Sequence, residues 1–138
     1  MRSEAIFVPV SVLALWTTCV LLMTGFRRVR AVRARRISSD AFQFGESRDV
    51  PPDVALPNRN LMNLLEMPLL FYVVAVALYV THHAGHGAVR LAWIYVVLRV
   101  LHTCEHLTSN HVRRRLVVFA ASNFVLAALW IRFLVAVL

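Results

Sequence analysis

Two stretches of this sequence place polar and ionisable side chains at helical spacing within apolar surroundings. In the first, Arg59, Asn63 and Glu66 stand at positions i, i+4 and i+7, so at 3.6 residues per turn they share one face of a helix. The second stretch carries a similar stripe, formed by Arg99, His102, His106 and Asn110. Guanidinium, carboxylate, amide and imidazole groups together could bind a polar ligand that carries charges of both signs.

Part of the second stretch matches a zinc-peptidase pattern. Residues 102–106 read HTCEH, which fits H-x-x-E-H, a motif in which two histidines bind the metal and the glutamate is the general base. Such a site needs a further ligand, usually a carboxylate, from a later helix, but no Asp or Glu follows Glu105. The charge of Arg99 in the same stripe also opposes a dication. We therefore expect no metal site, and we expect the histidines of HHAGH (82–86) to be solvated.

The composition predicts that both stripes lie in a membrane protein. Of 138 residues, 59% are hydrophobic and only 16% are charged. Four apolar runs are each long enough for a helix to cross a bilayer core of ~30 Å, at residues 6–26, 61–81, 88–107 and 116–138. The expected fold is all-α, a single four-helix transmembrane domain covering residues 1–138.

The basic residues predict the orientation of the chain in the membrane. All 15 are arginine, and the formal net charge is +8. Seven lie in segment 27–57, none in 82–87 and three in 108–115. By the positive-inside rule, loops 27–57 and 108–115 are cytoplasmic and both termini lie on the other side, in what we expect to be a bacterial inner membrane. The clusters at 27–36 and 113–115 could also hold anionic lipid, and no motif suggests a nucleic-acid partner.

The two polar stripes are expected at the same depth. The second apolar run begins on the cytoplasmic side and the third ends there, so the stripes can face each other within one chain or across a subunit interface. Glu66 could simply pair with Arg59 or Arg99 between helices. The two stripes contain seven polar groups, however, and one ion pair would leave most of them unsatisfied. A polar ligand at the cytoplasmic surface would satisfy them.

The two motifs resemble the MAPEG family, the membrane-associated proteins of eicosanoid and glutathione metabolism. The carriers of the resemblance in the second helix are Arg59-x-x-x-Asn63-x-x-Glu66 and the Pro68 that follows. In the third helix the spacing of Arg99, His102 and His106, followed by Arg115, is similar to that of the prostaglandin E synthase type members. A Tyr usually stands at the position of His106, so the contact that a phenol would make is altered here.

The resemblance implies a homotrimer that binds glutathione between neighbouring subunits near the cytoplasmic side. It implies that Arg59, Asn63 and Glu66 hold the charged ends of the tripeptide, with Arg99, His102 and His106 on the other wall. Arg113 or Arg115 would be the catalytic residue that stabilises the thiolate. The chemistry is compatible, because glutathione has two carboxylates, one ammonium group and a thiol with an unperturbed pKa of about 8.5.

These observations favour one function and leave two others open. The leading hypothesis is a glutathione-dependent membrane enzyme, a transferase or peroxidase acting on hydrophobic electrophiles that enter from the bilayer. The alternative is a non-catalytic protein of the same fold that binds an anionic lipid or another small molecule. A third possibility is a transporter or channel subunit, for which Ser122, Asn123 and Arg132 are the further polar groups of the fourth helix.

Overall fold

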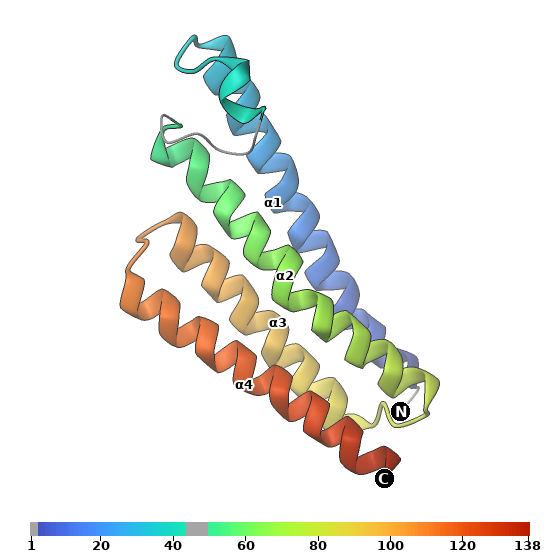
Figure 1. The fold of residues 1–138 in the computed structure, drawn as a ribbon. Helices are drawn as coiled ribbons and strands as arrows, with labels where there is room; N and C mark the ends of the chain where they lie inside the picture. The colour runs from blue at the N-terminus through green and yellow to red at the C-terminus, as the bar shows by residue number, and fades with distance from the viewer. Residues whose placement is uncertain (1–2, 44–49) are drawn as a thin grey trace.

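The chain folds into an antiparallel bundle of long helices. The computed structural model describes residues 3–43 and 50–138, and within those ranges it contains four α-helices and two short 3₁₀ helices (Figure 1). In chain order the elements are η1 (Ser3–Ile6), α1 (Phe7–Arg33), η2 (Ser39–Phe42), α2 (Pro52–Val80), α3 (His86–Leu107) and α4 (Val112–Val137). The predicted all-α class and the four apolar helices are confirmed.

The helices extend beyond the predicted apolar runs at one end of the bundle. Segment 27–57 was expected to be a loop, but α1 continues through its basic residues to Arg33 and α2 begins at Pro52. Arginine is a good helix former, and its charge is favourable at the negative end of the helix dipole. Proline at the first helical position costs no hydrogen bond, which explains why α2 can begin at Pro52. The connection between the two helices is therefore shorter than expected.

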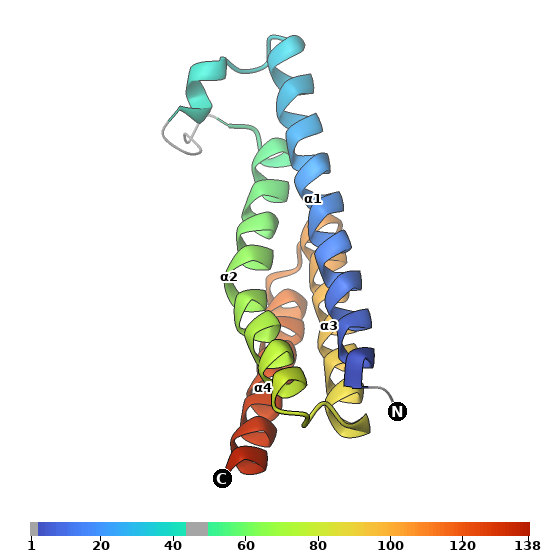
Figure 2. The same cartoon turned by 90° about the vertical axis from the view of Figure 1, so that its right-hand side faces the viewer.

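The middle helices form the centre of the bundle. Each of α2 and α3 packs against the other three helices, whereas α1 and α4 lie on opposite sides (Figure 1). Both views place the two termini and the α2–α3 connection at one end of the bundle, and the other two connections at the opposite end (Figure 2). The C-terminal part of α3 and the first turns of α2 and α4 therefore come together, as the matched stripes require.

Aromatic and aliphatic side chains fill the space between the helices. Phe71 of α2 and Tyr95 of α3 are fully buried and stack with their ring centroids 4.6 Å apart. At the end of the bundle that contains the N-terminus, Phe7 of α1 and Tyr79 of α2 pack edge to face with their ring centroids 4.8 Å apart. Such pairs contribute about 0.5–1.5 kcal/mol beyond the burial of their area. The first pair holds α3 against α2, and the second holds α1 against α2.

Several hydroxyl groups of the apolar helices donate to the backbone of their own helix. Thr17 Oγ1 donates to the carbonyl oxygen of Leu13 at 2.9 Å, and Thr24 Oγ1 donates to that of Val20 at 2.8 Å. This pairing removes the cost of an unpaired donor where water is absent.

Large apolar side chains cover the outer faces, with Leu22 67% exposed, Phe124 76% and Val135 71%. These faces suit contact with lipid or with another subunit.

Candidate functional site

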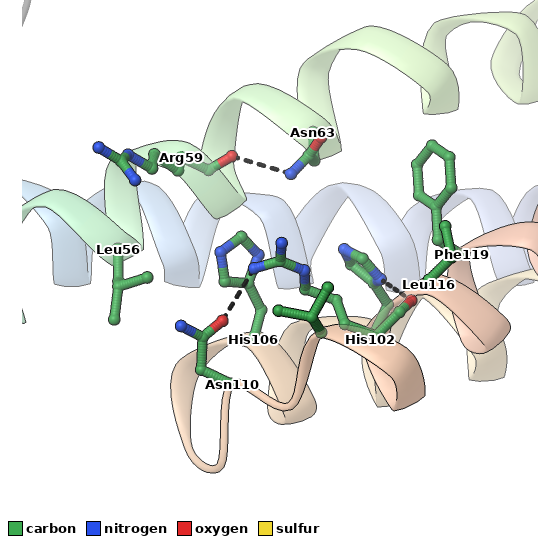
Figure 3. A pocket seen from close by; sticks show the side chains of 10 residues that line it. Leu56, Arg59, Asn63, His102, His106, Asn110, Leu116 and Phe119 are labelled. Atoms are coloured by element: carbon green, nitrogen blue, oxygen red, sulfur yellow. Dashed lines mark hydrogen bonds between the residues drawn. The ribbon is translucent and has the colours of Figure 1, made fainter.

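A cavity of about 530 Å³ opens between α2, α3 and α4, at the end of the bundle that contains the α3–α4 turn (Figure 3). Its polar lining comes from both predicted stripes and from the start of α4, namely Arg59, Asn63, His102, His106, Asn110 and Arg115. Its apolar lining is Leu56, Val112, Leu116 and Phe119. The size is within the range of small-molecule sites, ~300–1,000 Å³.

The cavity is strongly cationic. Arg59 on α2 and Arg115 on α4 both contribute to the lining, and no described Asp or Glu does. Arg115 is held in place, since its Nη1 donates to Asn110 Oδ1 at 2.8 Å. Asn63 Nδ2 donates to the backbone oxygen of Arg59 at 3.1 Å. Two guanidinium groups without a carboxylate between them create a site for an anionic group.

The two histidines leave ring nitrogens without partners. His102 Nδ1 lies 3.3 Å from the backbone oxygen of Arg115, and a carbonyl oxygen can only accept, so this nitrogen carries the proton. Within the described chain, His102 Nε2 and His106 Nδ1 are buried and make no hydrogen bond. Buried polar atoms of this kind are uncommon in native structures. A polar ligand or ordered water in the cavity would satisfy them.

Arg99 lies behind the cavity wall. Its side chain is fully buried, with Nε donating to Tyr95 Oη at 3.0 Å and Nη2 donating to Asn123 Oδ1 at 3.0 Å. Its guanidinium carbon is 5.2 Å from the ring centre of Tyr95 and 5.2 Å from that of Phe119. Because Phe119 lines the cavity and packs on Arg99, its aromatic ring separates the Arg99 guanidinium from the cavity. In the described part of the chain Nη1 has no partner.

Two further residues of the predicted set lie away from the cavity of a single chain. Glu66 is exposed on α2, and within residues 3–43 and 50–138 it forms no ion pair with Arg59 or Arg99. Arg113 is exposed on the outer side of α4, outside the cavity that Arg115 lines. The structure therefore separates the two arginines that the sequence could not distinguish.

The histidines and the glutamate of the H-x-x-E-H pattern do not line the same cavity. His102 and His106 stand with their ring centroids 5.9 Å apart, one turn from each other on α3. Glu105 lines a groove on the outer face of the bundle and accepts a hydrogen bond from Ser109. Among the described residues no three His, Cys, Asp or Glu side chains gather as metal ligands would.

Sequence reasoning missed the apolar lining and the partners of Arg99. Leu56, Leu116 and Phe119 do not differ in the sequence from residues that face lipid, so no signal marked them. Asn123 did carry a signal, since an amide inside an apolar helix needs a partner. Arg99 lies at the same depth in the neighbouring helix, so the Arg99–Asn123 hydrogen bond could have been predicted from the sequence.

Fold and site together define an integral, multi-pass membrane protein with a cationic cavity at one end of its bundle. Each of the four described helices is long and apolar enough to span a bilayer. The model of the MAPEG family matches residues 6–135, so this chain belongs to the MAPEG family. Neither the curated proteins nor the solved structures gave a match. Membership of this family is consistent with a glutathione-linked membrane enzyme and with a non-catalytic relative.

Proposed function

We propose that this protein binds glutathione in the cavity between α2, α3 and α4 and uses it as a thiol nucleophile or reductant toward hydrophobic electrophiles. The supporting observation is the convergence of Arg59, Asn63, His102, His106 and Arg115 on one cavity that no described carboxylate neutralises. Glutathione has two carboxylates, and guanidinium groups are the strongest side-chain partners for them.

Arg115 is the proposed catalytic residue. A guanidinium stays protonated at any physiological pH, so it stabilises a thiolate without titrating itself. Arg115 lines the cavity and Asn110 holds it there, whereas Arg113 lies outside. In a transferase reaction the thiol proton leaves, the sulfur forms a bond to the electrophilic carbon and the leaving group departs. In a peroxidase reaction two glutathione molecules are oxidised to the disulfide as a hydroperoxide is reduced to an alcohol and water.

Glu66 is proposed to complete the site across a subunit interface. Glutathione also has an ammonium group, and a carboxylate is its natural partner, but none lines the cavity of a single chain in the described ranges. Glu66 is exposed on the same helix as Arg59 and Asn63. In a homotrimer it would face a neighbouring subunit, and the ligand would bind between two subunits.

The apolar lining suits the second substrate. Leu56 of α2 and Leu116 and Phe119 of α4 belong to the cavity lining, and Leu116 is 63% exposed. A hydrophobic electrophile dissolved in the bilayer could reach the sulfur past Leu116 without crossing water. The cavity end is proposed to face the cytoplasm of a bacterial cell, where the arginine-rich connections belong under the positive-inside rule.

Calorimetry of glutathione binding to detergent-purified protein tests the proposal, together with absorbance near 240 nm, where a thiolate absorbs. We expect Arg115→Ala to abolish the thiolate absorbance and to lower turnover by about 100-fold or more, as for loss of one charge-stabilising donor. Arg113→Ala is the matched control, with the same change of charge on the same helix but outside the cavity.

Each outcome has a definite meaning. A thiolate signal lost in Arg115→Ala and kept in Arg113→Ala supports the assignment. Equal loss in both variants would contradict the role of Arg115. Absence of binding at millimolar glutathione would overturn the proposed function, and a co-purifying anionic lipid would then favour the non-catalytic alternative.

A further inference from the structure

A second polar cavity, of about 400 Å³, lies where α1 and α2 approach their connection. Its lining consists of Arg27, Arg30, Ala31, Arg36 and Asp53. None of these residues lines the cavity assigned to glutathione. This end of α1 projects beyond the ends of α3 and α4 (Figure 1). The second cavity is therefore a separate feature of the molecule.

Hydrogen bonds to Asp53 of α2, from α1 and from the connection that follows it, build the walls of this cavity. Arg36 Nη1 and Nη2 each donate to one carboxylate oxygen of Asp53 at 3.0 Å, the bidentate geometry that orients a guanidinium. Arg27 Nη1 donates to the backbone oxygen of Asp53 at 3.0 Å. Two arginines are thus held from one residue on the first turn of α2.

The cavity has more positive than negative charge. Three guanidinium groups line it, and the carboxylate of Asp53 balances one of them. Arg30 lies three residues after Arg27 on the same side of α1, and its side chain forms no hydrogen bond or ion pair in the described part of the chain. A cavity with two uncompensated guanidinium groups is suited to a phosphate.

The position of the cavity points to a phosphate attached to lipid. Arg27 is the first charged residue after the apolar run of α1, so the cavity opens at the level where lipid headgroups begin. Leu22, Phe26 and Arg30 follow one another at intervals of four residues on α1, and the first two are both 67% exposed. They form an apolar track along which an acyl chain can lie with its phosphate at Arg30.

We propose that the cavity formed by Arg27, Arg30 and Arg36 binds the phosphate of an anionic phospholipid, whose acyl chain packs on Leu22 and Phe26. This site differs from a general attraction of basic residues to the membrane surface, because it depends on which arginines line the cavity. It is independent of the glutathione proposal, and either can fail without the other.

The test compares arginines of the same helix. Purified protein in neutral detergent is titrated with phosphatidylglycerol, and the lipid-bound fraction is measured by native mass spectrometry. Arg30→Gln should weaken binding about fivefold, and Arg27→Gln with Arg30→Gln about 25-fold. Arg33→Gln is the matched control, because Arg33 is exposed one turn further along α1 and does not line the cavity. It should change binding by less than about twofold.

Three results would overturn the proposal. Equal effects of Arg30→Gln and Arg33→Gln would mean general electrostatic attraction. Equal binding of phosphatidylcholine would mean that the net negative charge of the headgroup does not contribute to binding. Binding of glycerol 3-phosphate as tightly as phosphatidylglycerol would identify a soluble phosphate compound as the ligand. Because the side chain of Arg30 makes no hydrogen bond or ion pair among the described residues, its substitution should leave the fold intact, and an unchanged circular dichroism spectrum and melting temperature would verify this.

Discussion

At the scale of single residues, the fully buried Arg99 shows how a bundle holds a charge with no acid among the described residues paired with it. Its donors reach Tyr95 and Asn123, and the faces of Tyr95 and Phe119 cover the guanidinium. A buried charge costs little only when it is hydrogen-bonded, and removing one partner costs more than removing the charge itself. Through its hydrogen bond to Asn123, Arg99 therefore helps to hold α4 in place against α3.

These contacts predict effects of different size for two substitutions. Asn123→Leu leaves a buried guanidinium with one partner fewer, so it should lower the free energy of unfolding in detergent by about 1.5–3 kcal/mol. Arg99→Met removes the charge and keeps much of the volume but leaves Tyr95 Oη and Asn123 Oδ1 without their donor, so it should cost less, about 1 kcal/mol. In the Arg99→Met background the cost of Asn123→Leu should disappear. A larger loss for Arg99→Met than for Asn123→Leu would show that the charge itself is required, for example by a ligand.

At the scale of elements, the turn between α3 and α4 positions the proposed catalytic arginine. Asn110 has a positive φ of 47°, a conformation that Asn tolerates better than most residues. Its backbone N–H donates to the carbonyl oxygen of Glu105 at 2.8 Å, which closes the end of α3. Its side chain accepts from Arg115. One residue thus ends one helix and orients a side chain of the next.

Substitutions at Asn110 separate these two roles. Asn110→Ala loses the side-chain acceptor and strains the backbone, so it should destabilise the protein by about 1–2 kcal/mol and weaken the thiolate absorbance. Asn110→Gly also loses the acceptor, but glycine adopts positive φ without strain. We expect Asn110→Gly to keep near-native thermal stability and to show the same weakened thiolate signal. A native thiolate signal in Asn110→Gly would contradict the orienting role of the side chain.

At the scale of the whole molecule, the proposed site is incomplete in one chain. The cavity contains cations and neutral polar groups, and Glu66 is exposed elsewhere on α2. In a closed ring of identical subunits, every interface repeats the same contact, so one acid on each chain could complete every site.

Mixed oligomers test whether Glu66 acts on a neighbouring subunit. Arg59→Ala and Glu66→Gln should each lower glutathione affinity by about tenfold or more when present in every subunit. If the two residues of one site come from different chains, oligomers that contain both variants should regain some native sites, detected by calorimetry of the co-expressed protein. If both come from one chain, every site in the mixture remains defective. Native mass spectrometry of the same sample would count the subunits and test the trimer.

The class of the fold and the two polar stripes could be predicted from the sequence alone. Apolar length and the periodicity of Arg59, Asn63 and Glu66 or of His102 and His106 are local properties of the chain, and the MAPEG match agrees with what they indicated. Helix ends were less predictable, because arginines beyond an apolar run stay helical when solvated.

Which members of the two stripes meet in one cavity depends on how the helices pack, and the sequence did not predict it. Spacing along a helix defines a face, but the rotation and packing of the neighbouring helix determine what that face contacts. Arg99, Arg113 and Arg115 were all predicted as site residues. In the structure Arg99 lies behind Phe119, Arg115 lines the cavity and Arg113 lies outside it. The second arginine cavity depends on Asp53, which lies 17 residues from Arg36 in the sequence and pairs with it only because α1 and α2 pack side by side.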